Sequence, residues 1–176
     1  SLYAATKKSN ELMAHAYSKL YDIPATGLRF FTVYGPMGRP DMAYYKFAKK
    51  IVNNETIQIY NNGDMMRDFT YVDDIVKGIL NIIPNPPAEN EAGAKYKVYN
   101  IGNNKPEKLM DYISTLEKCL GMEAKKEFLP MQPGDVYQTY ADVTELMNDF
   151  GFKPSTTIEE GLGKFAEWFK EYYNIG

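Results

Sequence analysis

Strand-like and helix-like segments alternate along the chain, and this alternation constrains the fold more than any other feature. Residues 2–21 carry apolar side chains at helical spacing, and residues 26–34 (TGLRFFTVY) form a strand-like run. The same alternation continues to a last helix, which is expected to begin at Ser155. Alternating strands and helices predict an α/β fold.

Turn and capping residues locate the remaining elements. We expect strands at 57–60, 67–72, 95–101 and 126–129, and helices at 41–52, 73–83, 106–121 and 143–150. Residues 61–64 (NNGD) predict a hairpin turn between the first two of these strands. Asp41 is predicted to cap one helix, and Pro106 is predicted to begin another.

Composition excludes several classes of protein. Apolar residues make up 44% of the 176 residues and charged residues 24%, which excludes a disordered or fibrous chain. The net charge of −3 argues against a nucleic-acid or anionic-membrane partner. No apolar run approaches the roughly 18 residues of a membrane helix. One cysteine, Cys119, cannot form an internal disulfide and fits a cytoplasmic location, and no Cys/His cluster suggests a metal.

The thirteen glycines include no dinucleotide-binding loop. A nucleotide-binding α/β enzyme normally carries G-x-G-x-x-G after its first strand, because the glycines allow the backbone to approach a pyrophosphate. The nearest match is Gly35-x-x-Gly38, which is followed by Asp41 where a third glycine would fall. The chain therefore carries no dinucleotide fingerprint.

Two Tyr-x-x-x-Lys pairs are present, Tyr3 with Lys7 and Tyr45 with Lys49. On a helix this spacing places both side chains on one face, where an ammonium favours the phenolate of a general base. Composition alone predicts roughly 1.4 such pairs by chance, so the spacing does not separate a catalytic pair from a surface pair.

The residues around Tyr3 distinguish the Tyr3–Lys7 pair from the Tyr45–Lys49 pair. Residues 1–11 (SLYAATKKSNE) resemble the active-site helix of the extended short-chain dehydrogenase/reductase family, and specifically of its nucleotide-sugar epimerases. Further blocks follow in the family's order: LRFFTVYGPMGRPDM (28–42), GDMMRDFTYVDDIV (63–76), YNIGNNKP (99–106) and QPGDVYQTYAD (132–142). Residues 32–41 look most like the UDP-glucuronate 4-epimerase branch.

The resemblance implies an NAD-dependent enzyme of about twice this length, whose Rossmann half precedes Tyr3. We therefore expect the chain to be a C-terminal half that is inactive alone. Residues 1–34 would be the last Rossmann helix and strand, and 35–176 mainly the mixed α/β nucleotide-sugar domain. Residues 68–104 would pack back on the Rossmann side. By the same resemblance, the parent would hold NAD tightly and form a homodimer through the Tyr3 helix.

The resemblance also implies catalytic roles. Tyr3, as phenolate, would take the proton of the sugar C4 hydroxyl while NAD receives the C4 hydride. Lys7 would hold the nicotinamide ribose and lower the tyrosine pKa, and Tyr34 would also contact the cofactor. The family's catalytic Ser/Thr lies upstream of the tyrosine, and Ser1 is not that residue.

Arginine is scarce, with three residues against seventeen lysines. A guanidinium can bind phosphate or carboxylate with two parallel hydrogen bonds, which an ammonium cannot. By resemblance, Arg67 would contact the UDP diphosphate; the alternative is an ion pair with Asp68 or Asp74. Arg39 would contact a substrate carboxylate; the alternative is a local pair with Asp41.

Four other residues complete the predicted substrate site by resemblance. Thr32 takes the place of an asparagine in galactose-type epimerases, and its hydroxyl suits a sugar with a C6 carboxylate. Gln58 lies in the strand that supports uracil through backbone groups. Asp135 would contact the ribose. Gln132 replaces an arginine that many relatives place on the phosphates, which fits the glucuronate branch.

Five residues that resemble catalytic groups are assigned structural roles. Asp73 and Asp74 open a helix, where carboxylates cap and favour the dipole. His15 is expected to be packed or solvated, Arg29 to be structural, and Cys119 to be a small core residue.

Three functions remain open at this point. The favoured one is an NAD-dependent 4-epimerase that interconverts UDP-glucuronate and UDP-galacturonate through a 4-keto intermediate. A nucleotide-sugar decarboxylase or 4,6-dehydratase is the first alternative, because its deciding acids would lie upstream. A non-catalytic fragment that binds a UDP-sugar is the second.

Overall fold

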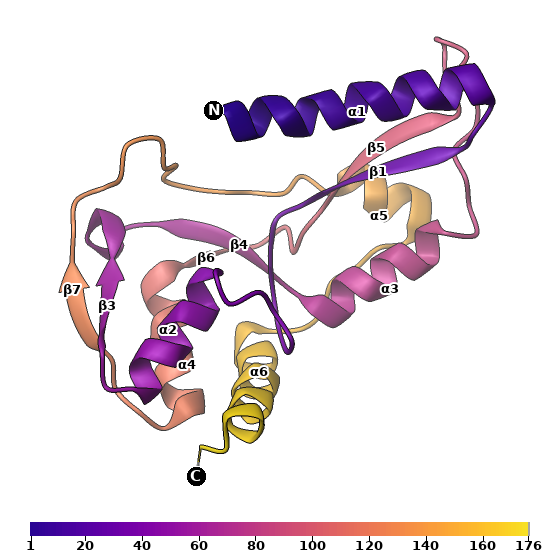
Figure 1. Ribbon diagram of the computed structural model, residues 1–176. Coiled ribbons are helices and arrows are strands. Elements are labelled where there is room, and N and C mark those ends of the chain that lie inside the picture. Colours follow the sequence, from indigo (N-terminus) through magenta and orange to yellow (C-terminus); the bar gives the residue numbers. More distant parts are fainter. Residues whose placement is uncertain (176) are drawn as a thin grey trace.

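The computed structural model describes residues 1–175 and confirms the α/β class (Figure 1). In chain order the elements are α1 (Leu2–Tyr21), β1 (Ala25–Phe30), β2 (Thr32–Tyr34), α2 (Ala43–Val52), β3 (Thr56–Ile59), the 3-10 turn η1 (Tyr60–Gly63), β4 (Met66–Tyr71), α3 (Val72–Ile82), β5 (Tyr96–Ile101), β6 (Pro106–Lys108), α4 (Leu109–Leu120), β7 (Lys125–Phe128), α5 (Thr144–Phe150) and α6 (Ile158–Tyr173). Within residues 1–175, no helix has the length and apolar character needed to cross a membrane.

The strand predicted at 26–34 is two strands in two different sheets. β1 pairs in parallel with β5, from Ala25 opposite Tyr96 to Phe30 opposite Ile101. β2 pairs in parallel with β4. Phe31 separates them, and its N–H still donates to the Ile101 carbonyl at 3.3 Å. One apolar run therefore passes from one sheet to the next.

The hairpin predicted at residues 61–64 is wrong. Asn61 and Asn62 do adopt positive φ, at 49° and 51°, but they form the 3-10 turn η1. β3 pairs in parallel with β7, and the Asn62 N–H donates to the Leu129 carbonyl at 3.0 Å. The turn therefore redirects the chain into β4, which pairs with β2 and β6 instead.

Three predicted helix starts are shifted. The helix predicted from Asp41 begins at Ala43, after Met42, which makes no side-chain cap. The last helix begins at Ile158, and the Thr157 side chain accepts the Glu160 N–H at 3.2 Å. Pro106 begins the short strand β6 instead of a helix, antiparallel to β4.

Asp74 does not cap its own helix. The residue before α3, Tyr71, makes no side-chain cap. The Asp74 carboxylate is buried and accepts the backbone N–H groups of Ser155 and Thr156 at 3.2 and 2.9 Å. The carboxylate therefore anchors the segment that leads into α6, and the capping prediction for Asp74 is wrong.

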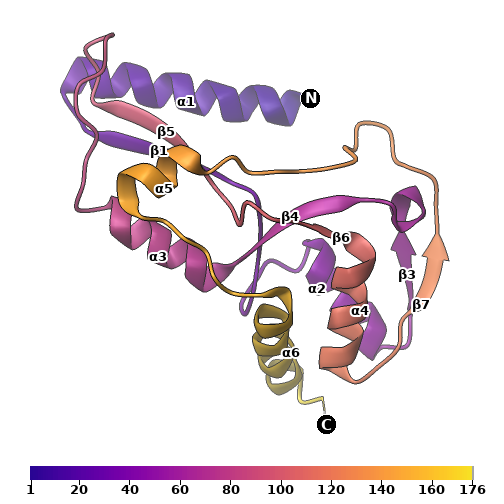
Figure 2. The same cartoon turned by 180° about the vertical axis from the view of Figure 1, so that it is seen from behind.

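Two apolar clusters form the core. The larger joins α2, α4 and α6 to β2, β3 and β4, and it is rich in aromatic side chains such as Tyr34, Phe69 and Tyr112. The smaller joins β5, α3 and α5. Figures 1 and 2 show α1 along one face of the β1–β5 pair, with α3 and α5 on the other face. Among the described residues, neither cluster includes a residue of α1.

A buried carboxylate on β4 connects these parts. The Asp68 side chain is fully buried and accepts three backbone N–H groups. They come from Asn103 at 2.8 Å, Asn104 at 3.0 Å and Ala141 at 3.0 Å. The backbone N–H of Asp68 in turn donates to Thr139 Oγ1 at 3.1 Å. Asp68 thus fixes the loop after β5 and the segment before α5 to the sheet of β2, β4 and β6.

We expect Asp68→Ala to lower the free energy of unfolding by about 3 kcal/mol or more, because hydrogen bonds to a charged group are worth about 1.5–3 kcal/mol each. Urea unfolding followed by circular dichroism measures the loss. The control is Asp111→Ala, which removes an exposed acid from the first turn of α4 and is expected to cost less than about 1 kcal/mol. Equal losses in the two variants would show that Asp68 is not the anchor.

Candidate active site

Tyr3 and Lys7 lie next to each other near the start of α1. The Lys7 Nζ is 5.4 Å from the centroid of the Tyr3 ring. Ser1 caps the helix by accepting the Ala4 N–H at 3.2 Å, which fixes this first turn. The Tyr3 side chain is 70% exposed, so a ligand can reach its phenol.

The second pair, at Tyr45, lies in a different environment. Tyr45 is 4% exposed and packs in the larger apolar cluster. Its hydroxyl hydrogen bonds to the Tyr173 hydroxyl at 2.8 Å, and burial first of all raises the pKa of Tyr45 to about 12. A general base needs the opposite shift, so the buried Tyr45 is unsuited to proton abstraction, whereas the Tyr3 phenol is exposed next to a lysine.

A groove of about 730 Å³ lies between α1 and the β1–β5 sheet. Tyr3 and Lys7 line it together with residues of both strands, including Arg29 and Tyr96. Glu11 crosses this groove: its carboxylate accepts Arg29 Nε at 2.6 Å and Arg29 Nη2 at 2.8 Å. Arg29 therefore has the structural role predicted for it, whereas Glu11 was not predicted. Its position one helical turn after Lys7, on the same face, was the available signal.

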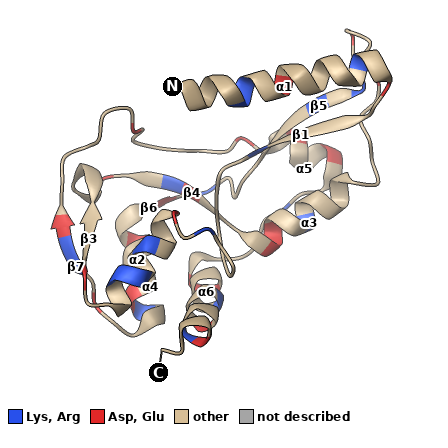
Figure 3. Cartoon of the chain, in the orientation of Figure 1, with Lys and Arg blue, Asp and Glu red and all other residues tan. Residues whose placement is uncertain are grey.

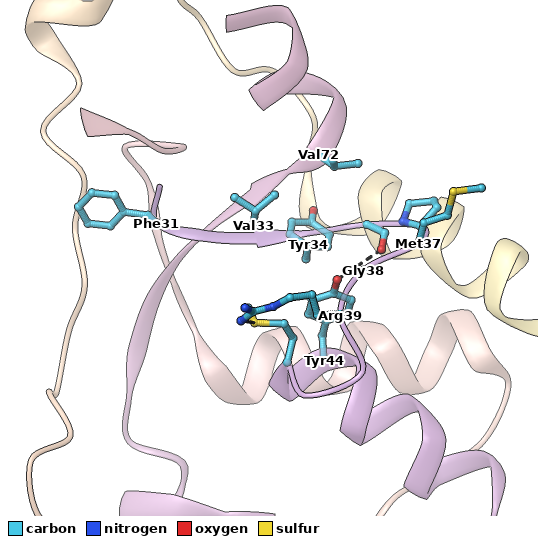
Figure 4. A pocket seen from close by; sticks show the side chains of 11 residues that line it. Phe31, Val33, Tyr34, Met37, Gly38, Arg39, Tyr44 and Val72 are labelled. Carbon is cyan, nitrogen blue, oxygen red and sulfur yellow. Dashed lines mark hydrogen bonds between the residues drawn. The ribbon is translucent and has the colours of Figure 1, made fainter. Parts of the chain in front are cut away.

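A smaller cavity of about 330 Å³ follows β2 (Figure 4). It is lined by the loop at Gly35 to Arg39 and by Tyr34, Met42 and Tyr44, among others. The Tyr44 hydroxyl donates to the Gly35 carbonyl at 3.4 Å, and a Cβ on Gly38 would collide with that hydroxyl. The lack of a side chain at Gly38 thus allows the loop to fold over Tyr44.

Arg39 lies at this cavity, as Figure 4 shows. Arg39 Nη2 is 3.4 Å from Asp41 Oδ2 and 3.5 Å from Met42 Sδ. The local pair with Asp41 is therefore present. Both side chains are largely exposed, at 75% and 65%, so this contact is weak and leaves the guanidinium accessible to a ligand.

Tyr34 is almost fully buried, and its hydroxyl donates to the Thr157 carbonyl at 3.4 Å. Burial is the main reason that its pKa lies well above the usual range for tyrosine. Its hydroxyl is engaged within the protein, so a cofactor contact by Tyr34 would involve its backbone or ring edge. Thr32, two residues earlier on β2, is half-buried.

Arg67 and Asp135 are in contact although 68 positions separate them. Arg67 Nη2 is 3.0 Å from Asp135 Oδ1, and Nη1 donates to the carbonyls of Met66 and Tyr137 at 2.9 and 3.0 Å. The side chain of Arg67 is 16% exposed. Its ion-pair partner is thus not a neighbour in sequence such as Asp68, whose carboxylate binds backbone N–H groups.

The two predicted glutamines lie on different segments of the chain. Gln58 Nε2 donates to Glu127 Oε2 at 3.2 Å, across β3 and β7. Gln132 lies in the exposed segment before Asp135, and its carbonyl accepts the Asp135 N–H at 3.2 Å. Within residues 1–175, neither glutamine side chain hydrogen bonds to Arg67 or Asp135. The structure therefore brings Arg67, Asp135 and the Gln132 backbone together, and it leaves Thr32 on β2, Arg39 in the loop after β2 and Gln58 on β3.

The other candidate residues, His15 and Cys119, pack against side chains of the protein itself. The His15 ring packs edge-on against Tyr96, with 5.6 Å between centroids. Cys119 is partly buried against the larger cluster, as predicted. No group of three or more metal-ligating side chains occurs in the described part of the chain.

The sequence model of the NAD dependent epimerase/dehydratase family matches residues 1–102, so the chain belongs to that family. Protein CapI of Staphylococcus aureus is 57% identical and aligns with 98% of this chain and 55% of its own length. The probable UDP-glucuronate 4-epimerase of Rhizobium meliloti is 47% identical, over 98% of this chain and 54% of its own.

The solved structures agree with the sequence relatives. The UDP-glucuronic acid 4-epimerase of Bacillus cereus, in complex with UDP-glucuronic acid and NAD, superimposes with a TM-score of 0.86. It is 35% identical, and the match covers 98% of this chain and 54% of that one. The chain therefore spans about half the length of the relatives that it matches.

Proposed function

We propose that this chain is the catalytic Tyr–Lys and substrate-binding part of an NAD-dependent nucleotide-sugar 4-epimerase. The observation that carries the proposal is the exposed Tyr3 phenol with the Lys7 ammonium beside its ring, 5.4 Å from the centroid. The favoured substrates are UDP-glucuronate and UDP-galacturonate, and the relatives named for this reaction support that choice.

In the proposed reaction, Tyr3 as phenolate removes the proton from the sugar C4 hydroxyl. Lys7 stabilises that phenolate electrostatically and binds the nicotinamide ribose. NAD, when bound, would supply the acceptor for the C4 hydride and the donor that reduces the 4-keto sugar again. The exposure of Tyr3 and Lys7 in one groove fits a cofactor approaching from outside this chain.

The substrate's nucleotide part is assigned to residues far along the chain. Arg67 binds the diphosphate, since a guanidinium suits phosphate oxygens and this one is already oriented by two backbone carbonyls. Asp135 binds the ribose, next to Arg67. Gln58 marks the strand whose backbone supports the uracil, and Gln132 lies near the phosphates.

The sugar's carboxylate is assigned to Thr32 and Arg39. Oxidation at C4 creates a keto group β to the C6 carboxylate, and such acids lose carbon dioxide readily. An epimerase must hold the carboxylate so that the breaking bond does not align with the keto π-system. A hydroxyl and a guanidinium can supply that hold, and Arg39 lies accessible at the cavity after β2.

The proposal also covers the rest of the protein, the division into domains and the assembly. An upstream segment supplies the dinucleotide loop, so the chain alone is inactive. Residues 1–34 belong to the Rossmann side, with 68–104 packed against it, and 35–176 form mainly the substrate domain. The whole protein is a homodimer in the cytoplasm. The exposed apolar residues of α1, among them Leu12 and Leu20, support the dimer, and few charged bands interrupt that helix in Figure 3.

We expect Tyr3→Phe to lower the turnover of UDP-glucuronate by about 10²–10⁴-fold, because the variant removes one positioned general base. The assay uses the protein extended upstream to the length of its relatives, and the affinity for the UDP-sugar should be nearly unchanged. Tyr45→Phe is the matched control, since Tyr45 is the second Tyr-x-x-x-Lys tyrosine and is buried. Similar turnover in the two variants would refute the assignment of Tyr3.

We expect Arg39→Ala to lower the kcat/KM for UDP-glucuronate at least about tenfold more than that for UDP-glucose, because only the former has a C6 carboxylate. A decarboxylated pentose product is also expected, and product chromatography with both sugars detects it. Asp41→Asn, which removes the local partner of Arg39 but keeps the guanidinium, is the control. Equal losses on both sugars without pentose would exclude the carboxylate role.

A further inference from the structure

Apolar packing contributes little to the position of α1 on its sheet. The strand residues that line the groove on this face include Gly27, Arg29, Tyr96 and Val98. The only buried residue of α1 is Ser18, near its far end, and the groove of about 730 Å³ runs under its first half. Polar contacts therefore decide how this half of the helix is held.

The main polar contact there is a fork. Arg29 Nε and Nη2 donate to the two oxygens of Glu11 at 2.6 and 2.8 Å, and Lys8 Nζ donates to Glu11 Oε2 at 2.7 Å. The Glu11 side chain is 19% exposed, against 49% for Arg29. Hydrogen bonds from Arg29 and then Lys8 lower the pKa of Glu11 from 4.5 to about 2, so the carboxylate is fully charged at neutral pH.

Lys7 has the helical spacing that would allow it to pair with the same carboxylate. Residues four apart on a helix are neighbours, and Lys7 and Glu11 have this spacing on the face that lines the groove. No ion pair is formed by Lys7 within residues 1–175; its ammonium lies over the Tyr3 ring instead. Glu11 is the nearest acid along the helix, and its two oxygens already accept three donors.

The groups facing Glu11 come from three elements. α1 contributes Lys7 and Lys8, β1 contributes Arg29, and β5 contributes Tyr96. Burial and, after it, the charge of Glu11 raise the pKa of Tyr96, so this phenol stays neutral. Arg29 is thus the one group from the sheet that can compensate the Glu11 charge.

We propose that Arg29 is a positioning residue whose fork holds the Glu11 carboxylate away from Lys7 and so leaves the Lys7 ammonium beside Tyr3. The proposal rests on the proposed function, in which Tyr3 and Lys7 act together. Without the fork, Glu11 would be free to pair with Lys7 and draw it from the phenol. The Arg29 guanidinium thereby fixes α1 to its sheet and keeps Lys7 available to Tyr3.

The test is the reactivity of the Lys7 amine in the 176-residue chain. Acetic anhydride at pH 8 acetylates each lysine in proportion to its deprotonated fraction, and fragment mass spectra separate Lys7 from Lys8. Lys49, which is exposed and belongs to the second Tyr-x-x-x-Lys pair, is the internal reference. We expect Arg29→Gln to slow the acetylation of Lys7 about 1.5- to 2.5-fold relative to Lys49, because a new pair with Glu11 favours the ammonium.

Two further variants test whether the effect comes from losing the Arg29–Glu11 fork or from losing one positive charge near Glu11. Lys8→Gln also removes a cation bonded to Glu11 but leaves the fork intact, so the rate at Lys7 should stay near that of the unmodified sequence. The double variant Glu11→Gln/Arg29→Gln removes the acceptor and should restore that rate. The proposal is overturned if Arg29→Gln leaves Lys7 unchanged, if Lys8→Gln slows it equally, or if the double variant stays slow.

A separate measurement checks that each variant folds, and the acetylation rate does not depend on enzyme activity. Circular dichroism checks each variant; should Arg29→Gln not fold, Arg29→Lys replaces it, because one ammonium cannot hold both oxygens of Glu11 in a fork. A smaller slowing at Lys7 is then expected, and no slowing contradicts the proposal. The rate requires no turnover, so a Tyr3→Phe enzyme that remains active would refute the proposed function and leave this result standing.

Discussion

The buried Asp68 carboxylate is the interaction on which the rest of the structure depends. Its three backbone partners belong to two segments that are distant in sequence from β4, the loop after β5 and the run before α5. Because successive strand residues point to opposite faces, fixing Asp68 also fixes the direction of Arg67 beside it. Arg67 then meets Asp135 on the segment that Asp68 has tied down. The buried Asp68 carboxylate thus orients Arg67, the side chain proposed to bind the diphosphate.

The two parts of the candidate site are held by different forces. The proposed substrate side is built on an aromatic core, in which Tyr34, Phe69 and Tyr112 pack ring against ring. Tyr3 and Lys7 stand on a helix outside both apolar clusters, joined to its sheet by the Glu11–Arg29 fork. Close packing allows the core side chains little displacement, and the two parallel hydrogen bonds of the fork fix the orientation of one charged pair. The helix that carries the proposed catalytic pair is therefore attached mainly through hydrogen bonds, and the proposed nucleotide-binding region through buried apolar area.

Local patterns predicted the elements well and their pairing poorly. The helices at α1, α4 and α6 follow from apolar spacing, which a single sequence displays. The split at Phe31 has no local signal, because both halves are apolar and β-prone. Asn61 and Asn62 took the left-handed conformation that a hairpin needs, but tertiary pairing with β7 decided where the turn leads. Likewise Arg67 was singled out from its rarity, while its partner Asp135 could come only from the fold.

Calorimetric titration of this chain with UDP-glucuronate and with NAD tests the central claim, that it holds the substrate side and the Tyr–Lys pair but not the dinucleotide anchor. We predict heat on adding UDP-glucuronate, with the affinity falling about 10- to 150-fold in Arg67→Ala, because one charge-assisted contact to the diphosphate is lost. NAD should give no binding in the micromolar range, since its pyrophosphate loop is missing from this sequence. Micromolar NAD binding, or UDP-glucuronate binding that Arg67→Ala does not change, would contradict the account.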